Sequence, residues 1–390
     1  MLVLMPACGS DTTQKEGGEK KAGSASEGNG QAAATEGGGQ VTNIGRPADV
    51  VDNGSSYVSP LTEIFGDIFV GQENFIASSS VLRAAPDLRV EVEDGATVQD
   101  NVVVRAKNKS VTIGAESSLG HHAIVRDSQI EDSAYIGYNS EISDSRIGSG
   151  ALVYHGARVE GVEIPDNTYV PAGEVVTDQA AADALSKAEE AGDVDEYYQE
   201  ALLDIQDELT RGYIELYEKE GYASVLDVGP NPETSFNPEQ IEPQIGENVE
   251  LDDVVRGVGE VRIVEGSSVG RRTAILADEG SPIVIGPGAS IDDRVTFHAI
   301  KGSDVQAGKF LVVDDDAVLH GPLEVGDRVF LGERAVVFRA RLGDDVRIGE
   351  GATVVGPKGT ADDILEIPDD TLIPAGAVVT SEEDVQALER

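Results

Sequence analysis

The sequence predicts a mainly β protein built from two tandem left-handed parallel β-helices, with α-helices after the first. Two observations predict this class. An aliphatic residue, commonly followed by glycine, recurs about every six positions through two long stretches of the 390-residue chain. This period fits the hexapeptide repeat, in which three short strands form one triangular coil around the aliphatic side chains. The chain also has 45 glycines, no tryptophan and 5% aromatic residues, a composition that favours glycine-punctuated β-structure.

The N-terminal 48 residues differ from the rest. Residues 1–7 end in a short apolar run before Cys8, the only cysteine, and resemble the lipobox of secreted lipoproteins. We interpret residues 1–7 as the remnant of a signal segment and expect a lipid on Cys8; an unmodified thiol is the alternative. Residues 8–48, rich in Gly, Ser, Ala, Gln and Glu, are expected to form a flexible acidic tether. The expected location is the extracellular face of the cell membrane, where the chain is lipid-anchored or secreted.

The first β-helix and the helices that follow it are expected over residues 49–226. The six-residue spacing is clear at Leu119 and Val125, and again at Val153 and Val159. Two stretches rich in Ala, Glu and Leu follow, over about 179–191 and 195–220. In the second stretch one apolar helical face is formed by Leu202, Ile205, Leu209, Tyr213 and Leu216.

The second β-helix is expected over residues 227–390. A proline-containing connector, 227–240, precedes it. The repeat then returns, with Ile285 and Ile291 six positions apart. Both halves close alike, with Ile164-Pro165-Asp166 in the first and Ile367-Pro368-Asp369 in the second, which indicates a tandem duplication.

The charge is strongly acidic, with 72 acidic against 29 basic residues and a formal net charge of -43. Such a surface repels itself unless salt screens it, and it is typical of proteins from halophiles. Nucleic acid is excluded as an expected partner because no basic patch is visible to neutralise phosphates.

Both copies resemble the γ-class carbonic anhydrases, over about residues 56–390. The second copy is similar to the family at Asp278-Glu279-Gly280, Phe297-His298-Ala299 and Leu319-His320-Gly321-Pro322. The first copy is similar at Leu82-Arg83, Val98-Gln99-Asp100 and Leu119-Gly120-His121. The resemblance implies trimer-like packing of β-helices in a homo-oligomer, with metal sites between them, and reversible hydration of CO2 to bicarbonate.

The two copies have lost complementary halves of this three-histidine site. The first has Arg105 and Arg126 at the positions of His298 and His320, and the second has Asp315 at the position of His121. We therefore expect a first-copy domain to abut a second-copy domain, so that their junction restores one complete site. The alternative is that each copy trimerises with itself, with Asp315 as the third ligand.

The spacing of the two second-copy histidines suits one ion. His298 and His320 are 22 residues apart, one coil plus a small excursion, and neighbouring coils are about 4.8 Å apart. With His121 they would hold Zn²⁺ and leave a fourth position for water, although such a site also accepts Fe²⁺ or Co²⁺.

The resemblance also implies roles for four further residues. Glu279 would accept or relay the proton, Gln99 would orient the nucleophile, and Arg83 would pair with Asp278 across the junction.

At the opposite junction, Arg105 and Arg126 are expected to face Asp315 and Asp292 as structural ion pairs. The other two histidines, His122 and His155, are expected at the surface.

Two other functions stay open. One is a non-catalytic scaffold or binding protein descended from a carbonic anhydrase, suggested by the arginine replacements in the first copy. The other is a hexapeptide-repeat acyltransferase with a histidine as general base.

Overall fold

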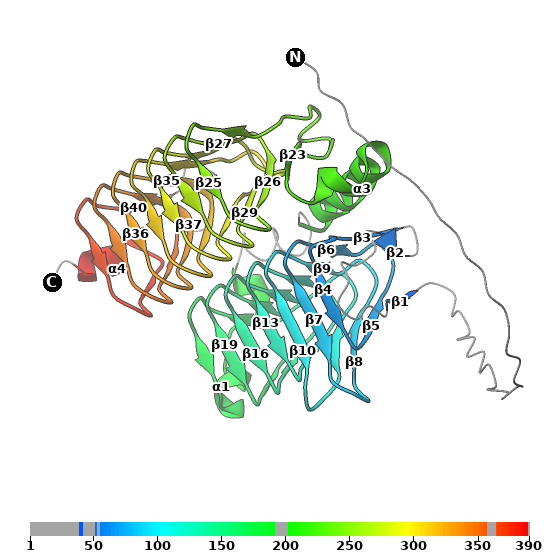
Figure 1. Cartoon of the computed structure of the whole chain (residues 1–390). Helices are drawn as coiled ribbons and strands as arrows, with labels where there is room; N and C mark the ends of the chain where they lie inside the picture. The colour runs from blue at the N-terminus through cyan, green and yellow to red at the C-terminus, as the bar shows by residue number, and fades with distance from the viewer. Residues whose placement is uncertain (1–38, 42–50, 53–54, 192–201, 357–363, 389–390) are drawn as a thin grey trace, which may run out of the picture. The chain divides into compact units, whose positions relative to one another are not determined.

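The structure, a computed structural model, describes residues 39–41, 51–52, 55–191, 202–356 and 364–388. Cys8, the predicted signal remnant 1–7 and most of the predicted tether lie outside these residues. The described chain forms two left-handed parallel β-helices, coloured blue to green and green to red in Figure 1. Within the described part, no helix is both long and apolar enough to cross a membrane.

The first β-helix has three sheets, which we name A, B and C, and each coil contributes one short strand to each. Sheet A consists, in spatial order, of β1 (Gly39–Val41), β5 (Asp67–Val70), β8 (Arg89–Val92), β11 (Val111–Ile113), β14 (Gln129–Ile130), β17 (Arg146–Ile147) and β20 (Glu163–Ile164). Sheet B consists of β2 (Val51–Asp52), β3 (Ser56–Val58), β6 (Phe75–Ile76), β9 (Thr97–Val98), β12 (Ser118–Leu119), β15 (Tyr135–Ile136), β18 (Leu152–Val153) and β21 (Tyr169–Val170). Sheet C consists of β22 (Val175–Val176), β19 (Arg158–Glu160), β16 (Glu141–Ser143), β13 (Ile124–Arg126), β10 (Val103–Ala106), β7 (Val81–Ala84) and β4 (Glu63–Phe65). Among the described strands of this β-helix, β1 pairs antiparallel with β5 and β2 with β3, and the other strand pairs are parallel.

The second β-helix repeats this winding with one thirteen-stranded and one seven-stranded sheet. The larger contains β23 (Val228–Gly229), β26 (Arg256–Gly259), β29 (Ala274–Ala277), β32 (Thr296–Ala299), β35 (Val318–Val325), β33 (Val305–Ala307), β30 (Ile283–Ile285), β27 (Val261–Ile263), β24 (Gln244–Ile245), β37 (Val336–Leu342), β39 (Thr353–Val355), β40 (Leu365–Ile367) and β42 (Val378–Val379). The smaller contains β25 (Glu250–Leu251), β28 (Ser268–Val269), β31 (Ser290–Ile291), β34 (Val312–Val313), β36 (Phe330–Leu331), β38 (Arg347–Ile348) and β41 (Leu372–Ile373). The larger sheet covers two sides because β35 pairs with β32 through its first half and with β33 through its second.

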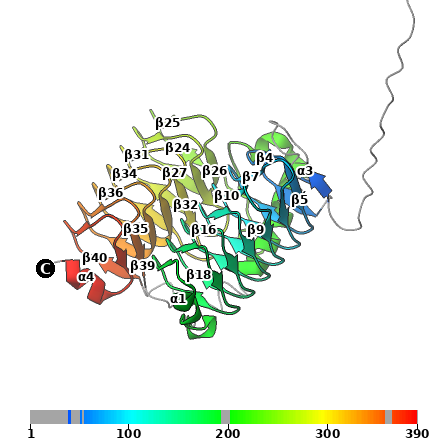
Figure 2. The ribbon, with the colours of Figure 1, turned by 90° about the horizontal axis from the view of Figure 1, so that it is seen from below.

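The six-residue period places one aliphatic side chain inside each strand. Leu119, Ile136 and Val153 are in register on successive coils of sheet B and are fully buried. Each β-helix has its own continuous aliphatic core, and burial of apolar surface stabilises it by about 25 cal/mol per Å². Figure 2 shows the coils stacked as parallel rungs.

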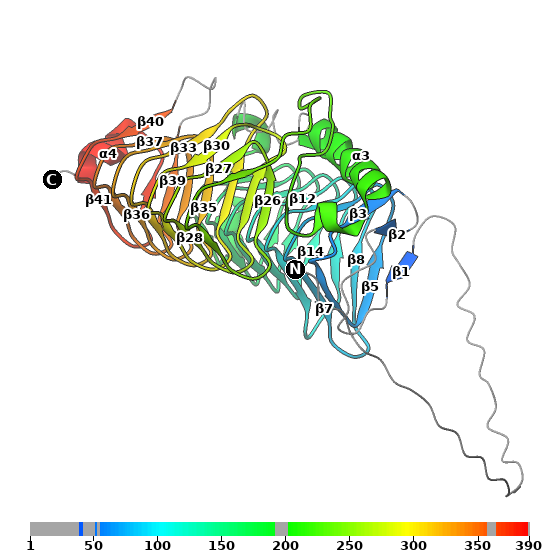
Figure 3. The same cartoon turned by 45° about the horizontal axis from the view of Figure 1, so that its top comes forward.

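Five short or medium helices accompany the described strands: α1 (Gln179–Asp183), η1 (Ala188–Ala191), α3 (Leu202–Glu220), η3 (Tyr222–Val225) and α4 (Glu382–Leu388). The predicted apolar face of the long helix is confirmed, since Leu202, Ile205, Leu209, Tyr213 and Leu216 are all buried. This face packs on Tyr57 and Phe75 of sheet B. Figure 3 shows α3 beside β3.

The two β-helices meet along a corner of each. Asn139 donates from its side-chain nitrogen to the carbonyls of Asp316 and Arg334, at 3.0 and 3.1 Å. Further along the same corner, Gly156 has a φ of +69° and lies against Thr353, so a side chain there would collide with the second β-helix. We call this contact region the junction.

Candidate metal centre

Three buried histidines converge at the junction. His298 and His320 are register partners on the adjacent strands β32 and β35, and His121 follows β12 of the first β-helix. One ring nitrogen from each lies within 4.8 Å of the other two, and His121 Nε2 is 3.2 Å from His298 Nδ1. A tetrahedral ion with Zn–N bonds of about 2.0–2.1 Å holds its nitrogens about 3.3 Å apart. The donor set therefore fits zinc.

The second nitrogen of each ring lies near an acceptor. His320 Nδ1 is 3.0 Å from the Gly321 carbonyl oxygen, and His298 Nε2 is 3.2 Å from Asp278 Oδ1. His121 Nδ1 is 3.6 Å from Asp100 Oδ2, and both residues belong to the first β-helix. Neither carboxylate contact has the geometry of a hydrogen bond. A neutral imidazole with its proton on the acceptor side directs its other nitrogen at the metal position.

Burial and neighbouring charge set the protonation of the three rings. Burial holds the pKa of His121 and His320 well below the usual histidine range, and the nearby His298 lowers both further. For His298 burial alone would lower the pKa, but the contact with Asp278 outweighs it and raises the pKa. Two of the rings are thus neutral at pH 7, the state that binds a metal.

The predicted acid pair lies beside His298. Asp278 and Glu279 are both buried, and Asp278 Oδ2 accepts a 2.5 Å hydrogen bond from the Tyr213 hydroxyl of α3. Although burial raises the pKa of Asp278, His298 and Tyr213 lower it below its usual value overall. Glu279 Oε2 is 3.8 Å from His298 Nε2, and its Oε1 accepts from the Lys301 backbone.

Gln99 and Asp100 approach the site from the first β-helix. The Gln99 side-chain oxygen accepts from the His121 backbone N–H at 3.1 Å, which fixes the orientation of the amide. Asp100 is buried, and this burial, together with the negative charge of Asp278, raises its pKa to about 7. Sequence reasoning gave Asp100 no role.

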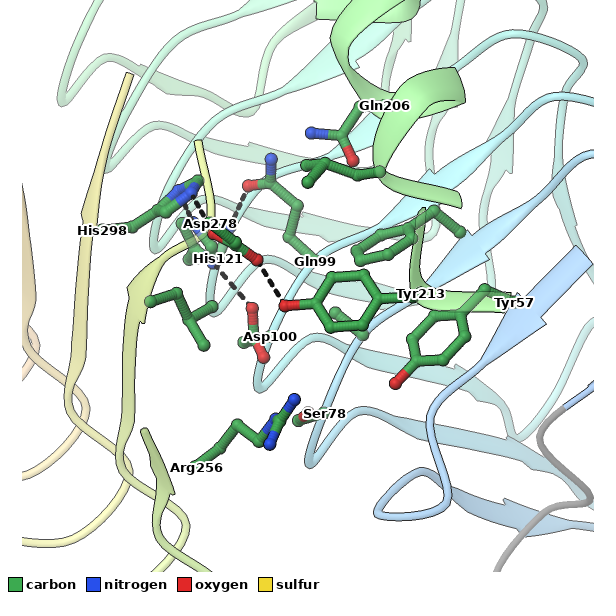
Figure 4. A pocket seen from close by; sticks show the side chains of 14 residues that line it. Tyr57, Ser78, Gln99, Asp100, His121, Gln206, Tyr213, Arg256, Asp278 and His298 are labelled. Atoms are coloured by element: carbon green, nitrogen blue, oxygen red, sulfur yellow. Dashed lines mark hydrogen bonds and ion pairs between the residues drawn. The ribbon is translucent and has the colours of Figure 1, made fainter. Parts of the chain in front are cut away.

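A small cavity of about 20 Å³ adjoins His121 and His298. Figure 4 shows it between His121 and His298 on one side and α3 on the other. The helix closes it with Gln206, Leu209 and Tyr213. The sequence predicted that the apolar face of this helix would pack, but not that it would cover a site.

Within the chain, Arg83 does not pair with Asp278 at the junction. Arg83 lies on β7 of sheet C, in register with Arg105, and its exposed guanidinium stacks over Phe65 at 5.5 Å. Gln99 and His121 follow strands of sheet B, a different side of the triangular coil. Arg83 therefore lies on a different side of the first β-helix from Gln99 and His121. The arginine that lines the cavity is Arg256 of β26.

The alternative ligand and the second predicted junction are also not formed within the chain. Asp315 is outside the histidine cluster; it accepts from the Asp293 backbone and is 3.6 Å from Arg294. Arg126 pairs with Glu141 at 3.8 Å instead of with an aspartate of the second copy. Neither of these two contacts crosses the junction, although Glu141 also pairs with Arg334 of the second β-helix at 2.8 Å.

His122 and His155 are buried, contrary to the surface positions expected. His122 contacts Thr296 Oγ1 at 2.9 Å across the junction. His155 accepts from the Tyr138 backbone N–H, and the two rings stack at 4.2 Å. The hexapeptide pattern shows which residues point outward, but the junction covers some outward positions.

Comparison with known proteins gives several relatives and no matching family model. The chain is 33% identical over 168 residues to a carbonic anhydrase of Methanosarcina thermophila, covering 40% of this chain and 65% of that protein. It is 30% identical over 143 residues to the carboxysome assembly protein CcmM of a Nostoc species, covering 34% of this chain and 26% of that protein. It is 28% identical over 142 residues to the mitochondrial γ carbonic anhydrase 1 of Arabidopsis thaliana, covering 35% of this chain and 50% of that protein.

The chain has a γ-carbonic anhydrase-like hexapeptide-repeat fold. It spans less than two thirds of the length of each of these relatives. Among solved structures, a hexapeptide transferase family protein of Anaplasma phagocytophilum is 22% identical, with a TM-score of 0.32, over 40% of this chain and 91% of that one.

Proposed function

We propose that the chain catalyses reversible hydration of CO2 to bicarbonate at a metal site shared by its two β-helices. The observation that carries this proposal is the convergence of His121, His298 and His320, with one ring nitrogen from each within 4.8 Å. A bound Zn²⁺ would supply an activated water as the nucleophile, and Fe²⁺ or Co²⁺ could serve in its place.

Two polar residues of the first β-helix, Gln99 and Asp100, line the cavity and could act on a small substrate. The amide of Gln99, fixed by the His121 backbone, is available to orient a substrate or water in the cavity. Asp100 lines the same cavity and, with a pKa of about 7, can hold or release a proton at neutral pH. Glu279 remains the relay that the family resemblance implies, 3.8 Å from His298 Nε2.

The size of the cavity favours CO2 over a larger substrate. Its walls include the apolar side chains of Phe75, Leu209 and Leu276, which suit an uncharged molecule. About 20 Å³ does not admit an acyl carrier, so the site does not favour the acyltransferase alternative.

The first experiment measures metal content and CO2 hydration of the purified full chain. We expect bound metal, hydration activity, and loss of both in His121→Ala and His298→Ala. Asp315→Ala is the matched control and should keep both, because Asp315 lies outside the cluster. Metal retained by His121→Ala and lost by Asp315→Ala would overturn the shared site.

A scaffold or binding protein is the second candidate. It is favoured by the similarity to a carboxysome assembly protein and by Arg105 and Arg126, which leave the described residues with one histidine cluster. A folded full chain that binds no metal and hydrates no CO2 would support it, whereas metal-independent acetyl-CoA turnover would support the acyltransferase.

We also propose that Cys8 anchors the chain at the extracellular face of the membrane. The proposal rests on the lipobox-like sequence before Cys8 and the tether-like composition of residues 8–48. Radiolabelled fatty acid fed to expressing cells should label the wild-type chain and not Cys8→Ser. Equal labelling of both, or of neither, would contradict the anchor.

A further inference from the structure

A buried guanidinium lines the cavity beside the candidate metal centre without a carboxylate partner. Arg256 is 2% exposed. Among the described residues, no carboxylate oxygen lies within 4.0 Å of its guanidinium nitrogens. Its Nη1 and Nη2 donate to the backbone carbonyls of Asp227 and Ser224, at 2.6 and 3.3 Å. These neutral acceptors hold the side chain in place but do not balance its charge.

A buried charge without a counterion is costly, so such a group is ordinarily paired. The nearest candidates within the cavity wall are Asp100 and Asp278, and both have other contacts. Asp278 accepts from Tyr213 and lies beside His298, and Asp100 lies beside His121. Although burial raises the pKa of Asp100 overall, the charge of Arg256 acts to lower it, so Asp100 offsets part of that charge without forming an ion pair. The N–H donors of Arg256 that the two carbonyls do not use are therefore available to a ligand.

The geometry of β26 directs this charge at the cavity. Arg256 is in register with Ala274, and Ala274 with Thr296, so it lies two coils away from the strand that carries His298. The ring of Tyr213 is 6.0 Å from the guanidinium carbon. In the view of Figure 4, Asp100 lies between Arg256 and the pair formed by His121 and His298.

We infer that Arg256 is the anion-binding residue of this cavity and takes a small planar oxyanion of the bicarbonate class. A guanidinium presents a planar set of five N–H donors, and two are used by the carbonyls. The remaining donors match two oxygens of one carboxylate-like group, which a lysine ammonium cannot match. The small cavity excludes larger anions.

This inference rests on the proposed function only for the identity of bicarbonate as the product. The anion site itself needs no metal, because its residues are not the histidines. A test on chelator-treated chain therefore separates failure of the anion site from failure of the metal centre.

The experiment titrates ¹³C-bicarbonate into the metal-free full chain and follows binding by NMR line broadening. Potassium glutamate serves as the background salt because its anion is too large for the cavity. We expect wild-type chain to bind, and Arg256→Gln to weaken binding at least about tenfold, the scale of a lost charged hydrogen-bonding partner. Arg83→Gln is the matched control and should bind like wild type, because Arg83 is exposed on sheet C.

Arg256→Lys guards against a folding defect, since it keeps the charge and loses the planar donor set. We expect it to fold, as judged by circular dichroism, and to bind bicarbonate about tenfold more weakly. A purely structural role would lower the melting temperature of both Arg256 variants and leave bicarbonate affinity unchanged. That result, or equal weakening in Arg83→Gln, would overturn the assignment.

Discussion

At the scale of single residues, the candidate centre depends on the acceptor behind each ring as much as on the ring. Asp278 is the clearest case, because it lies 3.2 Å from His298 Nε2 and is itself held by the Tyr213 hydroxyl. Loss of its negative charge would free the ring to rotate and would weaken its basicity.

We therefore expect Asp278→Asn to weaken metal binding by about 10–100-fold. Competition with a chelator at pH 7 would measure the metal affinity. Asp315→Asn is the control, because Asp315 lies outside the histidine cluster. Equal metal affinity in wild type and Asp278→Asn would show that the acceptor contact does not matter.

Asp100 gives a second prediction, about pH. Its folded-state pKa, raised by burial and by Asp278 to about 7, exceeds the ordinary 3.8. Between these values the folded metal-free chain holds a proton that the unfolded chain has released, so this group destabilises folding as pH rises. We expect Asp100→Asn to raise the melting temperature of metal-free chain more at pH 8 than at pH 5. An equal gain in melting temperature at pH 5 and pH 8 would contradict a raised pKa of Asp100.

At the scale of elements, the junction can be tested with two glycines of nearly equal backbone conformation. Gly156 has φ +69° and a side chain there would lie 2.4 Å from Thr353 Oγ1, whereas Gly161 has φ +71° and open space around it. Both alanine variants are destabilised equally by the left-handed backbone conformation, by about 1–2 kcal/mol.

Only Gly156→Ala adds overpacking against the second β-helix, about 1–3 kcal/mol more. We expect it to lose more stability in urea unfolding than Gly161→Ala, and also to lose metal affinity, because the junction positions His121 against His298. Addition of Thr353→Ala should restore part of the loss. Equal destabilisation by the two glycine variants would mean that the junction does not form as described.

The elements also show what the sequence could and could not predict. The six-residue period identified the coils and their interior, as at Leu119, because each coil is a local pattern. The place of Arg83 on sheet C could not be predicted, because a period of six does not say which of the three sides of a coil faces the other β-helix. Arg256 and the burial of His155 depend on the junction and on α3, contacts between segments far apart in sequence.

At the scale of the whole molecule, the charge of -43 is the dominant property. Pairs such as Arg328 with Asp345 offset little of it, since 72 acidic residues face only 29 basic ones. Exposed charges repel over about 10 Å at 0.1 M salt and over about 3 Å at 1 M salt. Paired strands place acidic side chains opposite basic or uncharged ones, as Glu324 opposite Arg341. Acids crowd at the turns instead, where burial and the charges of Asp314 and Asp315 raise the pKa of Asp292, and low salt leaves such groups largely unscreened.

We therefore expect the melting temperature of the full chain to rise with KCl between about 0.1 and 2 M, most steeply at the low end, where the screening length changes most. A sucrose series of equal osmolality is the control, because sucrose favours burial without screening charge. An equal rise in sucrose would assign the effect to solvent exclusion, and a flat KCl series would refute the prediction of a salt-adapted surface. A variant with several exposed aspartates changed to asparagine should need less KCl for the same melting temperature, because its self-repulsion is smaller.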